Sequence, residues 1–252
     1  MYDDTCRFLA ENFSTDFASW LLGEPVTLTE IQPSELSLDP IRADAMILLQ
    51  SEASILHLEF QTLPKSEIPF RMLDYRVRGQ RRYKDKSMRQ VVIYLKPTTS
   101  ELVYQTCYEL ERTRHEFDVI RLWEQPASLF LQYPGLLPFA TLGRSESPEG
   151  MLHQVTQLVD RIEDSMTQAN LMAASAILAG LRLEDNVIQR LVQRDIMQES
   201  TVYRSIQRER DRAIALNLLR EGISVETVAR STELPIEEVQ QLQQQLNEPA
   251  QS

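Results

Sequence analysis

The chain has 252 residues, of which 42% are hydrophobic and 25% are charged, a composition that excludes a disordered or fibrous protein. Its formal net charge of −11 argues against indiscriminate nucleic-acid binding, because clustered Lys and Arg are what bind the phosphate backbone. The two cysteines and three histidines are widely spaced, so neither a disulfide framework nor a zinc site is indicated. The opening residues lack the pattern of an export signal, and no apolar run reaches the roughly 18–20 residues of a membrane span, so we expect a cytoplasmic protein without a membrane partner.

The first half of the chain mixes helical and strand patterns. Apolar residues at steps of three and four predict an amphipathic helix that ends at Gly23, and a second helix is expected to begin at Pro69. Short alternating or apolar runs between turn signals predict strands, which together with the helices indicate an α/β domain. In order, we expect helix 6–23, strands 42–50 and 54–62, helix 69–83, and strands 89–97 and 117–126.

The second half of the chain predicts helices only. We place a boundary at residues 145–150, which gives an α/β domain at 1–147 and a helical region at 148–252. Residues 224–243 predict two short helices whose spacing resembles a helix-turn-helix. The second of these helices presents Glu237 and Glu238, which disfavours DNA reading. A helical interaction or oligomerisation unit, for example one that forms a homodimer, is the favoured interpretation.

Polar residues alternate with apolar ones in the strand predicted at 54–62. His57, Glu59 and Gln61 point to one face of this strand, and Leu56, Leu58 and Phe60 to the other. The simplest interpretation is a half-buried strand with a wet face that carries His57 as an ordinary polar residue. A general base or a metal ligand is the alternative for His57.

A hairpin of the strands at 42–50 and 54–62 would bring a second carboxylate to the face of Glu59. If paired residue numbers sum to 103, Asp44 lies opposite Glu59, and if they sum to 105, Asp44 lies opposite Gln61. Either register makes Asp44 and Glu59 neighbours, and like charges across a strand pair are destabilising. Carboxylate oxygens suit Mg²⁺, so a divalent cation is the economical way to offset the repulsion.

A basic segment follows this strand. Between Arg71 and Arg89 there are eight basic residues against two acidic ones, a net charge of +6. Arg71, Arg78 and Arg82 fall close to one face of the predicted helix, where guanidinium groups would match phosphates. The alternative is a solvated helix whose arginine stems cover apolar surface.

The pattern from Asp44 to Gln61, together with the segments "PFRMLDYRVRGQRRY" and "RQVVIYLKPT", resembles the PD-(D/E)XK nuclease superfamily. More narrowly, with "LAGL" in the C-terminal half, it is similar to the recombination-promoting nuclease/putative transposase family, especially its cyanobacterial-type members. The resemblance covers about residues 1–230. It implies a PD-(D/E)XK core, a mixed sheet flanked by helices, followed by an all-α C-terminal region.

The resemblance also implies a function: a metal-dependent DNA endonuclease linked to recombination or mobile elements. Gln61 stands where the superfamily usually has lysine and would orient the water or the phosphate, although its amide supplies no positive charge. A catalytically weak or inactive nuclease-fold protein that binds DNA or another protein is the alternative. The residues implied are Asp44 and Glu59 with the Phe60 carbonyl as ligands of Mg²⁺ or Mn²⁺, Gln61, Glu11 as the acid from the first helix, and Arg71, Arg78, Arg81 and Arg82 as DNA contacts.

Overall fold

A computed structural model describes residues 2–30, 46–192 and 200–247. The N-terminal segment forms two helices, α1 (Tyr2–Asn12) and α2 (Ser14–Leu22), where one helix was expected. The break falls at Phe13, whose backbone (φ −124°, ψ 39°) is not helical. Gly23 ends α2 in the left-handed region (φ 81°), as its position in the sequence predicts. The break lets both helices pack apolar side chains into the same core.

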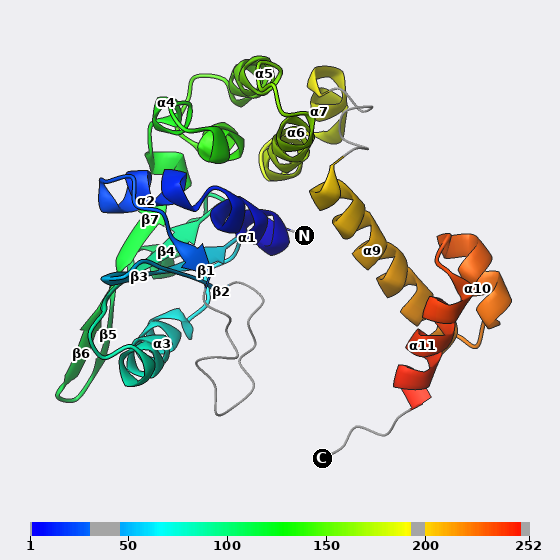
Figure 1. Cartoon of the computed structure of the whole chain (residues 1–252), viewed down its shortest axis with the longest axis horizontal. Helices are drawn as coiled ribbons and strands as arrows, with labels where there is room; N and C mark the ends of the chain where they lie inside the picture. The colour runs from blue at the N-terminus through cyan, green and yellow to red at the C-terminus, as the bar shows by residue number, and fades with distance from the viewer. Residues whose placement is uncertain (1, 31–45, 193–199, 248–252) are drawn as a thin grey trace.

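Five strands in the described residues form one mixed sheet with the order β1-β2-β3-β4-β7 (Figure 1). β2 pairs antiparallel with β3, whereas β4 lies parallel to both β3 and β7. The crossover from β3 to the parallel β4 carries helix α3 (Ile68–Arg82), which lies on the opposite side of the sheet from α1 and α2. The strands are β1 (Thr29–Glu30), β2 (Met46–Gln50), β3 (Ser54–Gln61), β4 (Ser87–Tyr94) and β7 (Asp118–Arg121).

A second, two-stranded sheet was not predicted. β5 (Cys107–Leu110) and β6 (Thr113–Glu116) form a hairpin that turns at Glu111 (φ 50°). Its sequence lacks an apolar alternation, because both strands are largely exposed. Charge pairing takes the place of burial: Arg114 forms an ion pair across the strands with Glu109 and a second ion pair with Glu116 on its own strand.

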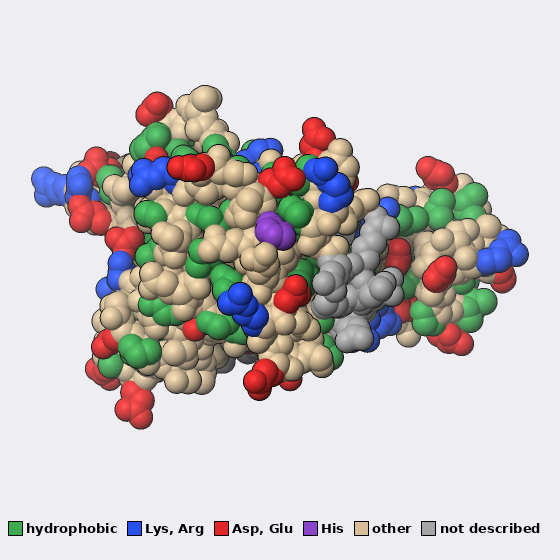
Figure 2. Space-filling view, turned by 90° about the horizontal axis from the view of Figure 1, so that it is seen from above, with side chains coloured by type: hydrophobic (Ala, Val, Ile, Leu, Met, Phe, Trp, Pro, Cys, Tyr) green, Lys and Arg blue, Asp and Glu red, His purple; other side chains and the backbone are tan. Residues whose placement is uncertain are grey.

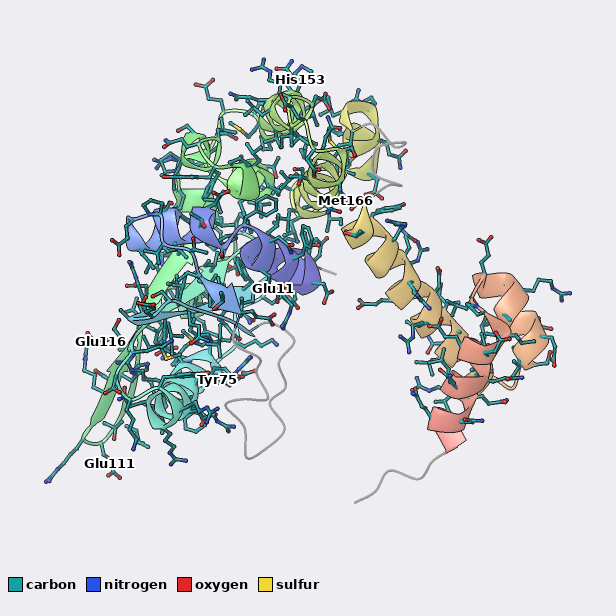
Figure 3. All side chains as sticks on the ribbon, viewed as in Figure 1. Glu11, Tyr75, Glu111, Glu116, His153 and Met166 are labelled. Carbon is teal, nitrogen blue, oxygen red and sulfur yellow. The ribbon has the colours of Figure 1, made fainter. Side chains whose placement is uncertain are left out.

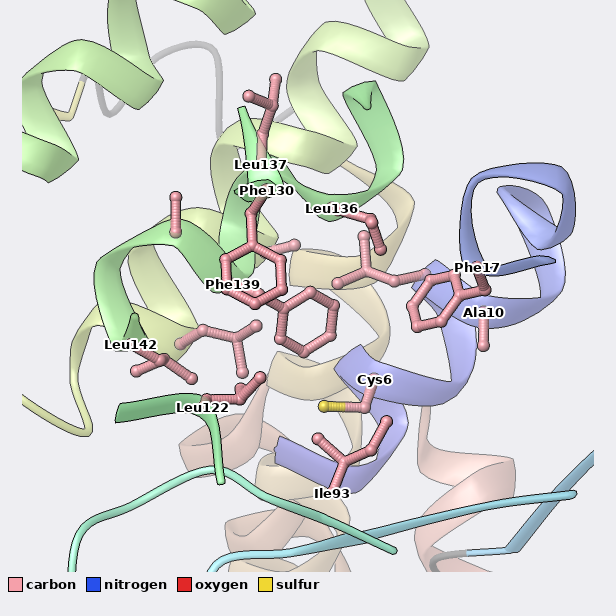
Figure 4. Packing of buried hydrophobic residues seen from close by; sticks show 14 of the residues in the cluster. Cys6, Ala10, Phe17, Ile93, Leu122, Phe130, Leu136, Leu137, Phe139 and Leu142 are labelled. Atoms are coloured by element: carbon pink, nitrogen blue, oxygen red, sulfur yellow. The ribbon is translucent and has the colours of Figure 1, made fainter. Parts of the chain in front are cut away.

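Helices cover the remaining side of the sheet. Phe17, Phe60 and Phe139 meet with ring centroids 5.9–6.4 Å apart and join α2, β3 and η4. Figure 4 shows Phe17 and Phe139 within this core. The same hydrophobic cluster extends to Leu152 and Leu171, so the packing continues across residue 147, and the domain boundary placed there stays a prediction. The elements are η2 (Glu101–Tyr104), η3 (Leu122–Glu124), α4 (Ala127–Phe130), η4 (Pro134–Leu142), α5 (Pro148–Val159), α6 (Ser165–Ala179) and α7 (Asp185–Leu191).

The last three described helices, α9 (Thr201–Arg220), α10 (Val225–Thr232) and α11 (Ile236–Asn247), form a unit with a separate hydrophobic cluster. Figure 1 shows α9 leading away from the body of the protein, with α10 and α11 packed against its far end. The predicted pair of short helices is therefore confirmed, with Glu233 in the left-handed region at the turn between them. None of the helices in 2–30, 46–192 and 200–247 combines the length and apolar character that crossing a bilayer requires.

The structure thus confirms the predicted α/β class, a mixed sheet flanked by helices and followed by a helical C-terminal region.

Candidate functional site

The polar face of β3 is buried beneath helix α3. His57 and Glu59 are 0% exposed and Gln61 is 4% exposed, so the expectation of a wet face is wrong. The cause is tertiary: α3 packs its buried residues, including Met72 and Tyr75, onto this face of the sheet. A row of polar side chains therefore lies inside the protein, where each polar atom needs a partner.

Glu59 is the charged centre of this row. Its Oε1 atom lies 2.7 Å from Nη2 of Arg71 and accepts a hydrogen bond of 3.2 Å from the amide nitrogen of Gln61. Its Oε2 atom is buried and has no hydrogen-bond partner among the described residues. Burial acts most strongly and lowers the pKa of Arg71, but Glu59, Tyr75 and Glu67 together outweigh burial and hold that pKa above its ordinary value. One carboxylate oxygen is thus held by a cation and an amide, while the other is open.

A hydrogen-bonded chain adjoins Glu59 on the same face. The Nε2 atom of His57 lies 3.8 Å from Oε2 of Glu59, beyond hydrogen-bond distance. On its other side, the His57 ring meets the amide nitrogen of Gln90 at Nδ1, 2.9 Å away. The oxygen of the same amide lies 2.8 Å from Nε2 of His115 on β6. His57 is therefore part of an internal network and not an ordinary surface residue.

Two tyrosines enclose the site. Tyr75 of α3 meets the His57 ring edge-on, with centroids 5.2 Å apart and planes at 84°, and its hydroxyl is hydrogen-bonded to Arg71. Tyr94 of β4 is the partner of Gln61 in the parallel register. Burial raises the pKa of Tyr94, and the nearby charge of Glu59 adds to this effect.

Asp3 on the first helix is an acid, not singled out from the sequence, that senses the charge of Glu59. Burial raises the pKa of Asp3 above its ordinary value, and the charges of Asp4 and Glu59 contribute while Lys65 opposes. Asp3 is thus electrostatically coupled to Glu59. No sequence signal linked Asp3 to Glu59, because acidic residues are favoured in the first turn of a helix whatever lies nearby.

Glu11, the expected first-helix acid, has other neighbours. Its carboxylate lies 3.9 Å from Arg7, and burial followed by the charge of Glu30 raises its pKa. Figure 3 shows Glu11 on α1 and Tyr75 on α3, with the sheet between the two helices. A role for Glu11 in the site stays a prediction.

Asp44 lies outside the described residues. The described pairs of β2 and β3, from Met46 with Glu59 to Gln50 with Ile55, have residue numbers that sum to 105, one of the two expected registers. The Gln61 carbonyl accepts from the Leu95 amide on the β4 side, so by strand alternation the Phe60 carbonyl faces the β2 side. Within the described ranges, no group of three or more His, Cys, Asp or Glu is placed to hold a metal ion.

The arginines of α3 have unequal roles. Arg71 is bound to Glu59, and Arg78 is bound to Asp74 at 2.9 Å, so both have acidic partners within the protein. Arg81 and Arg82, in the last turn of α3, are exposed. The opposite, helical side of the molecule, seen in Figure 2, has acidic and basic side chains interspersed. The exposed end of α3 is therefore the part of the basic segment that can contact phosphates.

No family model matches the chain, and neither a curated protein nor a solved structure matches it.

Proposed function

We propose that this protein is a Mg²⁺-dependent endonuclease that hydrolyses phosphodiester bonds of DNA at Glu59. The observation that carries the proposal is the asymmetry of the Glu59 carboxylate, which is fully buried with one oxygen held by Arg71 and Gln61 and the other oxygen unpartnered. Leaving an ionised buried oxygen without a partner is costly, and a bound cation removes that cost.

The residues at the site fit a hard cation. A carboxylate oxygen is a ligand that Mg²⁺ prefers, and Mg²⁺ needs only one or two protein carboxylates. Glu59 would hold the ion through Oε2, and Asp44 and the Phe60 carbonyl would complete the protein ligands; Mn²⁺ suits the same oxygens. When bound, the ion would lower the pKa of a water molecule and offset charge on the phosphate.

Arg71 would supply the positive charge that Gln61 lacks. The Gln61 amide donates to Glu59 and so keeps the carboxylate oriented. The Arg71 side chain is 24% exposed, so it extends from the buried carboxylate towards solvent. Its guanidinium group has five N–H donors, and those not used by Glu59 and Tyr75 would bind a phosphate oxygen.

The connectivity around Glu59 supports a PD-(D/E)XK core. An antiparallel hairpin of β2 and β3, a crossover helix and a parallel β4 place Glu59 near the end of a central strand. The resemblance in sequence adds the link to recombination or mobile elements, and the two widely spaced cysteines favour a cytoplasmic location. Arg81 and Arg82 would contact the DNA backbone, Arg71 would join them through the donors that Glu59 leaves unused, and Arg78 would join by exchanging Asp74 for a phosphate.

The C-terminal unit would mediate a homodimer. Arg208 and Arg212 both pair with Glu238 of α11, which makes the acidic second helix part of an internal network. Exposed apolar side chains, Ile214, Ile223 and Ile236, offer an association surface on this unit.

Nicking of supercoiled plasmid DNA tests the proposal. With Mg²⁺ or Mn²⁺ the purified protein should convert supercoiled plasmid to nicked and linear forms, and Glu59→Gln should abolish this while leaving DNA binding in a gel-shift assay intact. Glu52→Gln is the matched control, because Glu52 is exposed in the turn that joins the same two strands. Binding of DNA without cleavage of any plasmid, single-stranded or branched DNA would replace the nuclease with the alternative, an inactive nuclease-fold binding protein.

A further inference from the structure

The orientation of the Gln90 side chain is determined by its neighbours. Its amide nitrogen lies 2.8 Å from the main-chain oxygen of Met72 and 2.9 Å from Nδ1 of His57. A carbonyl oxygen can only accept, so the amide group must present its N–H donors to Met72. The same NH₂ group then faces His57, and the amide oxygen faces His115.

This orientation fixes the protons of both histidine rings. Because the Gln90 nitrogen donates, Nδ1 of His57 accepts, and the single proton of the neutral His57 ring is on Nε2. The Gln90 oxygen accepts from His115, so His115 has its proton on Nε2 as well. Burial, followed by the charge of Arg76, lowers the pKa of His115, which agrees with a neutral His115 ring.

The Nε2–H group of His57 faces Glu59. These two atoms, His57 Nε2 and Glu59 Oε2, are 3.8 Å apart, and both are buried without a hydrogen-bond partner among the described residues. A shift of less than 1 Å would form the hydrogen bond that both atoms lack. A carboxylate oxygen has two lone pairs, so Oε2 can accept from His57 and still ligate a cation.

We infer that Gln90 is a positioning residue that keeps the proton on Nε2 of His57, so that His57 donates a hydrogen bond to Glu59. His57 then cannot ligate a metal, and the site has oxygen ligands only and rejects Zn²⁺. The metal part of this inference rests on the proposed function; the tautomer does not. An imidazole nitrogen that bears a proton has no lone pair for a metal. With the opposite tautomer, His57 and Glu59 would form a nitrogen–oxygen pair of the kind that suits Zn²⁺ or Ni²⁺.

The surrounding packing keeps the chain of hydrogen bonds in register. Gln90 is the partner of His57 in the parallel pairing of β3 with β4 and is 5% exposed. Tyr75 packs its ring edge against the His57 ring and so opposes a flip. The Met72 carbonyl belongs to α3, so the same helix that buries Glu59 also sets the tautomer of its neighbour.

Nitrogen-15 NMR of histidine-labelled, metal-free protein tests the tautomer directly. The chain has only three histidines, so His115→Gln and His153→Gln variants assign the His57 signals. We expect long-range ¹H–¹⁵N correlations of His57 at neutral pH to show a protonated Nε2 and an unprotonated Nδ1. A proton on Nδ1 would overturn the inference, and the measurement requires no DNA cleavage, so it stands apart from the nuclease proposal.

Gln90→Glu tests the consequence for metal choice. A carboxylate at position 90 would accept from His57 and move its proton to Nδ1, as a carboxylate does for histidines that ligate metals. We expect Zn²⁺ to bind this variant about 10–100-fold more tightly than the wild type by calorimetry, and the gain to vanish when Glu59→Gln is added. Gln80→Glu, an exposed change on α3, is the matched control. If Gln90→Glu protein acquires the Nδ1–H tautomer of His57 without gaining Zn²⁺ affinity, the metal selection is refuted. The metal selection is also refuted if the wild type binds Zn²⁺ as tightly as the Gln90→Glu variant does.

Discussion

Replacing Arg71 by methionine should destabilise the protein mainly because it leaves the Glu59 charge buried without its cation. Removing one partner of a fully buried ion pair costs about 3–5 kcal/mol. Glu59 is 0% exposed but Arg71 is 24% exposed, so solvent screens part of the interaction, and we expect a loss of about 2–4 kcal/mol. Methionine retains the apolar stem of Arg71 but removes the guanidinium group, whose carbon lies 5.9 Å from the centroid of the Tyr75 ring, so the loss reports the charge and its contacts more than packing.

A double-mutant cycle isolates this interaction. In a Glu59→Gln background the buried charge is gone, and Arg71→Met should then cost only about 1 kcal/mol. Urea unfolding of the metal-free protein, followed by far-UV circular dichroism, measures both differences. With a urea slope on the order of 2–3 kcal/mol per M, the wild-type background should show a midpoint shift of about 1 M. Equal losses in the two backgrounds would show that Glu59 and Arg71 are not coupled, and the assignment of Arg71 as the cation of the site would fail.

Three further predictions use the same protein. Asp3→Asn should stabilise the metal-free protein at neutral pH, because burial raises the pKa of Asp3 above 3.8 and the folded state therefore favours the protonated form. This cost of ionising Asp3 is absent below pH 3.8 and grows as the pH rises towards the raised pKa, so the urea midpoints of variant and wild type should converge in acid. Equal midpoints at neutral pH, or the same gain from the exposed control Asp85→Asn, would contradict the prediction. In fluorescence anisotropy titrations, the double variant Arg81→Ala/Arg82→Ala should bind DNA more weakly and reduce the slope of log affinity against log salt by about 2. Replacing Arg78 by alanine should have a smaller effect, because the Arg78 guanidinium is bound to Asp74. Phe139→Ala should cost about 3–5 kcal/mol, because Phe139 is fully buried between Phe17, Phe60 and Phe130, while Phe70→Ala, at a position that is 55% exposed, should change the urea midpoint little.

Local patterns in the sequence predicted the elements that carry the site. Strict alternation predicted β3, and Pro69 with the apolar spacing after it predicted α3 within one residue at each end. The described pairs of β2 and β3 have one of the two expected registers. Each of these features depends on neighbours within a few residues, which a sequence pattern records.

The features that were missed depend on contacts between distant segments. Alternation shows that His57 and Glu59 share a face, but whether α3 or water covers that face is decided by the crossover to β4. Arg71 was expected to meet phosphates because its helical spacing cannot reveal Glu59, twelve residues earlier, as its partner. The hairpin of β5 and β6 escaped notice because ion pairs replace the apolar pattern that marks a buried strand.

The hydrophobic cluster that continues across residue 147 limits how the chain can be divided. A fragment that ends there would expose the apolar side of η4, including Leu136 and Leu137, which α5 and α6 cover in the whole protein. Such a fragment should aggregate, whereas one that ends before α9 would retain the cluster intact, because the last three helices have their own. Evolutionary exchange of modules, and laboratory grafting, would therefore succeed at the start of α9 and fail at residue 147.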